Sequence, residues 1–261
     1  MQLDVNGGSD QVTGTISDGV WTANLLGDRV VFNSITNQSP QAGRYTMVFS
    51  GSTNSVLSPG GDGCGVLLVK TDGSVRVSGR LGDNRSFSQA AYLSKNGQWP
   101  FYQSLYSKQG MIWGWLAFTN RPASSIEGGV HWFSPVSGAK YYPAGFSVLS
   151  QAFGSTYTPP LIYQRVLDLS NNCSLTITGG NLLSSQVNAA ILTQTNYVLG
   201  LDGGVLLRLA VPASGSMKGR FIHPTINAKR SFFGVVLQQE NTARGFFLGT
   251  NQSGAFLLQG N

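Results

Sequence analysis

The chain has 261 residues and a mass of 27.8 kDa, which is long enough to bury a core without help from disulfides or metals. Glycine accounts for 34 residues, charged residues for 11% and hydrophobic residues for 41%, a composition that excludes both a disordered chain and a helical bundle. No segment approaches the ~20 consecutive apolar residues of a transmembrane helix.

The net charge is +6, from 17 basic and 11 acidic residues. The basic residues are scattered and form no run of the kind found in nucleic-acid-binding arms, so we expect no specific nucleic-acid partner. Lys and Arg on strand edges oppose edge-to-edge pairing, and we expect most of these cations to serve there. Weak attraction to acidic polymers is the alternative.

Short segments that alternate apolar and polar residues follow one another along most of the chain, and no longer window has a helical period. Asp72-Gly73 and Asn96-Gly97 separate such segments and predict tight hairpin turns. We expect strands at 43–51, 65–71, 74–81, 98–106, 109–118, 128–134, 139–146, 172–179, 186–194, 204–211, 216–223, 229–239, 243–250 and 254–260.

One hairpin pattern recurs in the chain. Segment 78–93 resembles segment 218–237, and segment 13–26 is a fainter third copy. Each copy has a glycine in its first strand, a variable turn, and then an aromatic and aliphatic run. The recurrence favours duplication of a β unit, although hairpin chemistry alone also produces similar sequences.

Regularly spaced short strands with turn signals predict a sandwich or barrel. Segment 147–164 has little patterning and contains Pro159-Pro160, so we expect it to be a linker. The predicted fold is therefore all-β, an antiparallel meander with two related β-barrel-like lobes at 1–146 and 165–261.

Aromatic residues cluster between residues 99 and 142. Flat aromatic rings bind the apolar faces of sugars, and interleaved polar residues supply hydroxyl contacts. The candidate ligand-binding residues are Trp99, Tyr102, Trp113, Trp115 and Trp132. Ordinary core packing is the alternative, and alternation along 109–118 favours the face of Trp113 and Trp115 as core.

A hydrolytic site is a second hypothesis. His131 and His223 are the only histidines, and histidine is the usual general base near neutral pH. Cys64 is the candidate nucleophile with His131 as its base, and Asp62 or Glu127 is the candidate group that orients the base. No G-x-S-x-G, H-E-x-x-H or P-loop motif supports this hypothesis.

The sequence gives no reason to expect a metal or cofactor. Cys64 and Cys173 are too few and too far apart for a zinc or redox motif, and they are either buried thiols or one disulfide. Aspartates in glycine-rich turns such as 60–63 are better explained by turn chemistry than by calcium binding.

Ordered motifs along nearly the whole chain carry a family resemblance. They lie at 8–33, 40–51, 59–69, 93–118, 140–146 and 232–258. Together they resemble a β-rich module, often C-terminal, of very large surface or secreted proteins of Verrucomicrobia-type bacteria. Two positions depart from that pattern: Cys64 stands where an aromatic residue is usual, and His131 stands where a small polar residue precedes Trp132.

The resemblance implies a secreted, modular, barrel-like unit and brings no established catalytic mechanism. The first ten residues have neither the basic nor the apolar region of an export signal, so we expect a segment of a longer exported protein, at the cell surface or outside the cell. The expected function is structure, adhesion or glycan contact without catalysis. The expected partners are carbohydrate or another cell-surface polymer, and neighbouring domains. The alternative is a small hydrolase of activated esters or phosphoesters.

Overall fold

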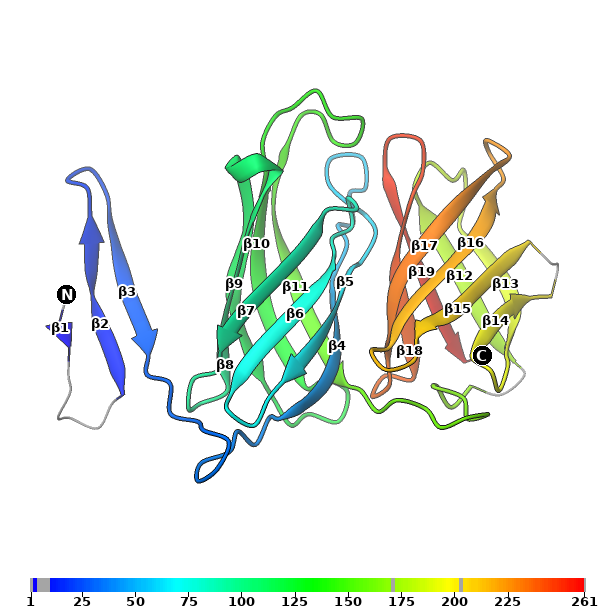
Figure 1. The fold of residues 1–261 in the computed structure, drawn as a ribbon. Helices are drawn as coiled ribbons and strands as arrows, with labels where there is room; N and C mark the ends of the chain where they lie inside the picture. The colour runs from blue at the N-terminus through cyan, green and yellow to red at the C-terminus, as the bar shows by residue number, and fades with distance from the viewer. Residues whose placement is uncertain (1, 4–9, 170–171, 202–203, 261) are drawn as a thin grey trace.

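The computed structural model describes residues 2–3, 10–169, 172–201 and 204–260, and its regular elements are antiparallel β-strands and one short 3-10 turn (Figure 1). The strands form a three-stranded sheet, an eight-stranded sheet and a closed eight-stranded barrel. The structure confirms the predicted all-β fold with two barrel-like lobes. Positive φ angles at Gly73 and Gly97, 76° and 71°, confirm the two predicted turns.

The N-terminal sheet comprises β1 (Gln2–Leu3), β2 (Gln11–Ser17) and β3 (Thr22–Asp28). It stands beside the first barrel, on the side away from the second barrel (Figure 1). An ion pair of 3.1 Å between Lys95 and Asp10 connects it to the first barrel. These strands were expected within the first lobe, but the structure separates them from it.

The first barrel is a meander that turns back on itself. Its strands are β4 (Gly43–Phe49), β5 (Gly63–Val69), β6 (Ser74–Arg80), β7 (Ser86–Tyr92), β8 (Gln98–Leu105), β9 (Gly110–Phe118), β10 (Ile126–Ser134) and β11 (Phe146–Thr156), with the 3-10 turn η1 (Tyr106–Lys108) between β8 and β9. Because β11 pairs with β4, strands β7 and β8 become the two ends of the sheet. Side chains join these ends, since Gln103 Oε1 accepts from Ser88 N at 3.2 Å and Gln89 Nε2 donates to Pro100 O at 3.0 Å.

Strand β11 changes the boundary expected between the lobes. Residues 147–156 were assigned to the linker, but they belong to β11, which pairs with both β4 and β10. The alternating pattern is lost at the end of this strand because Gly154 and Ser155 are both buried, one on each face. The expected strand 139–146 is a loop over residues 139–145, and its last residue, Phe146, begins β11.

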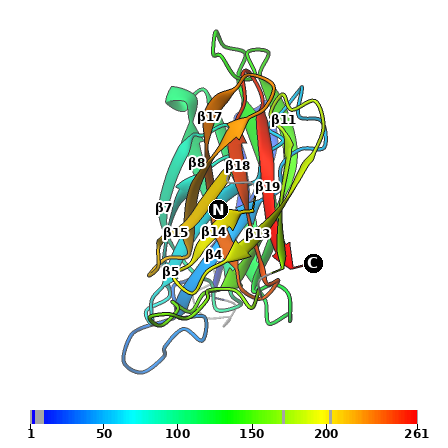
Figure 2. The same cartoon turned by 90° about the vertical axis from the view of Figure 1, so that its right-hand side faces the viewer.

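The second barrel is closed, because β12 pairs with β19. Its strands are β12 (Cys173–Gly179), β13 (Gln186–Leu192), β14 (Tyr197–Gly200), β15 (Val205–Val211), β16 (Ser216–His223), β17 (Ala228–Leu237), β18 (Thr242–Leu248) and β19 (Ser253–Gly260). Inward positions are apolar, as Met217 and Phe221 on β16 show, while Lys218 between them points outward. Figure 2 looks onto this barrel from the side opposite the first barrel. Within the described residues, no helix has the length and apolar character needed to cross a bilayer.

A third apolar group joins the two barrels, and we call it the inter-barrel cluster. Its members are Val48, Cys64, Val235, Leu237 and Phe246. Each barrel also has a larger core of its own. Polar contacts surround the cluster: Thr46 Oγ1 donates to Val236 O, and Tyr142 OH lies 3.1 Å from Ser253 Oγ. The barrels therefore share a packed interface.

Candidate functional site

Cys64 lies on β5 with its side chain directed toward the second barrel, in the inter-barrel cluster. Only 7% of the residue is exposed. Burial, with a smaller contribution from the charge of Asp62, raises the pKa of the Cys64 thiol to about 12. A thiol must lose its proton to act as a nucleophile, so this environment opposes catalysis by Cys64.

Asp62 precedes β5 at the edge of the same interface. Its Oδ1 accepts a hydrogen bond of 2.8 Å from Gly51 N, and its Oδ2 lies 3.9 Å from Arg244 Nη1. Burial raises the pKa of the Asp62 carboxyl, although the Gly51 amide and Arg244 act in the opposite direction. These contacts connect a loop of the first barrel to β18 of the second barrel.

His131 does not meet Cys64. It lies on the outer side of β10, and strands β11 and β4 separate β10 from β5. The row of cross-strand partners that starts at Cys64 runs through Val48 and Phe153 to Glu127, so His131 lies three strands away from Cys64 and four residues further along β10. Glu127 pairs with Arg121 at 3.0 Å, and His223 is fully buried in the second barrel, where its Nε2 lies 2.9 Å from Gly180 O. The structure does not assemble the hydrolytic constellation.

The described residues contain no group of three or more His, Cys, Asp or Glu residues placed to hold a metal ion. Cys64 and Cys173 are both free thiols; Cys64 is buried between the barrels, and Cys173 is buried in the core of the second barrel. The alternative of a disulfide between them is therefore wrong.

Two of the five candidate ligand-binding residues lie inside the first barrel. Trp99 has 0% exposure and Trp132 has 5%. Trp99 Nε1 donates to Gln89 Oε1 at 3.2 Å across the seam between β7 and β8, and Trp132 Nε1 donates to Tyr106 OH at 3.1 Å. Both rings therefore fill the core and their indole nitrogens are hydrogen-bonded, so neither ring is available to a ligand.

The other three candidates lie on the outer surface. Tyr102, Trp113 and Trp115 are 54%, 38% and 44% exposed. Alternation had favoured this face of β9 as core, but Ile112 and Leu116 occupy the interior instead, with 0% exposure. The reason is volume: an eight-stranded barrel holds a limited set of side chains, and the neighbouring strands already supply large rings.

Strand register sets the outer rings in a row. Tyr102 on β8 is the cross-strand partner of Trp113 on β9, which is the partner of His131 on β10, which is the partner of Leu149 on β11. The rings of Trp113 and His131 stack, with centroids 5.2 Å apart and planes inclined by 22°. Trp115 stands two residues further along β9. We call Tyr102, Trp113, Trp115 and His131 the aromatic face; Met111 and Phe133 extend it, with 37% and 38% exposure.

A buried polar corner that the sequence did not indicate lies at one end of the first barrel. Tyr106 OH donates to Asp83 Oδ2 at 2.7 Å beside a cavity of about 260 Å³. Burial raises the pKa of both groups. Tyr106, Ser107 and Lys108 have φ angles of 50°, 56° and 72°, a left-handed turn that costs roughly 1–2 kcal/mol per residue. Hydrogen bonds link the Tyr106 phenol to the Asp83 carboxyl and to the Trp132 indole, and these bonds stabilise the strained turn.

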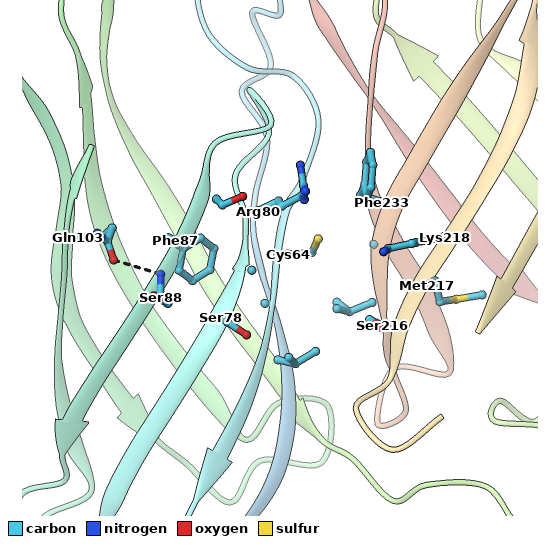
Figure 3. A pocket seen from close by; sticks show the side chains of 16 residues that line it. Cys64, Ser78, Arg80, Phe87, Ser88, Gln103, Ser216, Met217, Lys218 and Phe233 are labelled. Atoms are coloured by element: carbon cyan, nitrogen blue, oxygen red, sulfur yellow. Dashed lines mark hydrogen bonds between the residues drawn. The ribbon is translucent and has the colours of Figure 1, made fainter. Parts of the chain in front are cut away.

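A larger cavity of about 550 Å³ lies between the barrels (Figure 3). Strands β5 to β8 of the first barrel and β16 and β17 of the second barrel line it. Arg80 and Lys218 enter it from opposite barrels, as Figure 3 shows. The guanidinium of Arg80 lies 4.9 Å from the centre of the Phe233 ring and donates to Asn84 Oδ1 at 2.7 Å.

Comparisons with known proteins do not assign a family. No protein-family model matches the chain, and no curated protein matches it. Among solved structures, the chain is similar to an endo-1,5-alpha-L-arabinanase from Thermotoga petrophila RKU-1 in complex with TRIS, with a TM-score of 0.27 and 9% identity over 95% of this chain and 66% of that chain. A likeness of this degree carries no assignment of activity.

Proposed function

We propose that the chain is a non-catalytic module of a large exported bacterial protein, and that it contacts glycans through the aromatic face. The observation that carries the proposal is the row of Tyr102, Trp113 and His131 across three neighbouring strands, with Trp115 beside it. A location outside the cell accords with the composition, which is low in charge and rich in glycine.

The geometry of this surface suits a sugar. Trp113 and Trp115 leave about two-fifths of their surface open, 38% and 44%, and their backbone is fixed on both sides by neighbouring strands. Rings on a rigid sheet lose little conformational entropy on binding, and they offer flat apolar faces to the C–H groups of a pyranose or furanose. Exposed rings in one row are costly in water unless a ligand or partner covers them.

The test measures binding of neutral polysaccharides by affinity gel electrophoresis, with soluble glucan, mannan, xylan and arabinan as probes. Each stacked ring contributes on the order of 0.5–1.5 kcal/mol, so Trp113→Ala and Trp115→Ala should each weaken binding about two- to tenfold. Trp21→Ala is the matched control, because Trp21 is a 52% exposed tryptophan in the turn between β2 and β3 of the N-terminal sheet.

Two results would contradict the proposal. One is the absence of retardation by every neutral polysaccharide. The other is an equal loss of binding in the Trp21 control, which would mean that the aromatic face has no special part in it. Circular dichroism of each variant checks that the fold is retained.

A further inference from the structure

We propose that the chain carries a second ligand site, a basic groove that binds an acidic polysaccharide. The groove starts in the cavity between the barrels and continues over the outer surface of β14 to β17. Five cations belong to it: Arg80, Arg208, Lys218, Arg220 and Lys229. This site is separate from the aromatic face and does not depend on the function proposed for that face.

Shared lining residues show that the three hollows of the groove adjoin one another. The inter-barrel cavity of about 550 Å³ and a hollow of about 460 Å³ share Lys218. That hollow and a third, of about 490 Å³, share Leu206 and Arg220. Lys229 lines the third hollow. A ligand long enough to pass from the cavity over the second barrel would therefore meet all five cations in turn.

Edge protection does not explain these cations. The second barrel is closed, so β15, β16 and β17 each have a paired strand on both sides and none is an edge. Arg208 and Lys218 are direct cross-strand partners, an arrangement of like charges that destabilises a sheet. A like-charge pair on internal strands is costly to the fold, and an anionic ligand would offset that cost.

The positive charge of the groove is not neutralised by the part of the chain that the structure describes. None of the described residues that line the three hollows is Asp or Glu. The side chains of Arg208, Lys218, Arg220 and Lys229 take part in no ion pair with the described acidic residues. A concave surface lined by one sign of charge attracts polymers of the opposite sign.

The neutral residues of the groove favour a sugar polymer over a nucleic acid. Ser78, Ser88 and Ser231 supply hydroxyl groups that match sugar hydroxyls. Single-stranded nucleic acids need successive aromatic rings on which bases stack. Phe233 is already engaged by Arg80 at 4.9 Å and by Phe246 at 5.7 Å, which leaves Tyr197, 37% exposed, as the accessible ring among the described lining residues.

The test compares dextran sulfate with uncharged dextran, which has the same backbone, and adds polygalacturonate as a carboxylated probe. Single-stranded and double-stranded DNA are the competing polyanions. The variant Lys218→Gln/Arg220→Gln removes two cations from the middle of the groove. The control Lys70→Gln/Lys108→Gln removes two exposed cations outside it and keeps the same net charge as the variant.

We expect dextran sulfate or polygalacturonate to bind with an affinity that falls steeply as salt is raised, whereas any binding of dextran should not depend on salt. The groove variant should bind about tenfold more weakly at low salt, with a shallower salt dependence, because fewer counterions are displaced. The control variant should retain the affinity of the parent chain. Both double variants replace surface residues, and their melting temperatures verify folding.

Three results would overturn the proposal. The first is equal loss of affinity in the groove and control variants, which would reduce the effect to net charge. The second is binding of DNA as tight as that of the acidic polysaccharides. The third is loss of acidic polysaccharide binding in Trp113→Ala, which would move the ligand to the aromatic face. A failure of neutral glycan binding alone would contradict only the function proposed for that face.

Discussion

The position of Phe246 in the inter-barrel cluster predicts that this ring couples the unfolding of the two barrels. This ring lies on β18 with 0% exposure, stacks against Phe233 at 5.7 Å and packs among Val48 and Cys64 of the first barrel. It belongs to neither barrel core. Phe246→Ala therefore removes apolar contact chiefly from the interface between the barrels.

The expected cost follows from burial. Truncation of a fully buried phenylalanine to alanine costs on the order of 3–5 kcal/mol, through lost transfer free energy and the cavity left behind. Because each barrel keeps its own core, most of this loss should weaken docking rather than either barrel alone. We expect differential scanning calorimetry to show one cooperative transition for the parent chain and two for Phe246→Ala.

Phe232→Ala is the matched control, because Phe232 is also fully buried but lies in the core of the second barrel. It should lower the stability of that barrel itself rather than separate the two transitions. A single transition for Phe246→Ala, with a free energy of unfolding within about 1 kcal/mol of the parent chain, would refute the reasoning, since it falls well below the range for a buried ring.

Four further predictions test particular residues. Trp99→Ala should lower the free energy of unfolding in urea by about 3–5 kcal/mol because the ring is buried, whereas Trp113→Ala should lower it by about 1 kcal/mol or less. Equal losses would contradict the outward orientation of Trp113 on β9. Gly79→Ala should destabilise by roughly 1–3 kcal/mol, because a Cβ would lie 2.1 Å from the carbonyl oxygen of Cys64; a neutral effect in the same assay would argue against this strand contact. Cys64 should react with a thiol reagent only after unfolding, since its pKa is raised to about 12, and rapid labelling of the folded chain would show an accessible thiolate. Burial raises the pKa of Asp83 above its unfolded value of about 3.9. The protonated carboxyl therefore contributes its full share to the free energy of unfolding below about pH 3.9, and this contribution is lost as the pH rises through the pKa of the folded state. Urea unfolding should therefore show that Asp83→Asn becomes more stable relative to the parent chain between pH 4 and pH 7. An unchanged difference between their free energies of unfolding would contradict a raised pKa at Asp83.

Part of this organisation could be predicted from the sequence, because it depends on neighbouring residues. Alternation of apolar and polar residues predicts strands, and the glycines at Gly73 and Gly97 mark turns where φ is positive. The repeated hairpin and the low charge predicted two barrel-like lobes without helices. The same local signals failed at β11, where both faces are buried near the second barrel and alternation disappears.

The candidate surfaces depended on contacts between residues far apart in the sequence. Alternation shows that Trp113 and Ile112 point to opposite sides of β9, but it does not show which side is interior, because barrel volume decides that. Register across β8, β9 and β10 then sets Tyr102, Trp113 and His131 in one row.

Closure of the second barrel likewise decides which role its basic residues can have. Scattered cations were expected at strand edges, and a barrel that joins β12 to β19 has none. Closure therefore places Arg208 beside Lys218 on internal strands and, with the first barrel docked alongside, opens a basic groove. Sequence by itself determined the strands and their turns, because these depend on local alternation and backbone preference. Only the tertiary structure decided which side chains face the solvent and which of them lie together, because pairing and docking join residues that are distant along the chain.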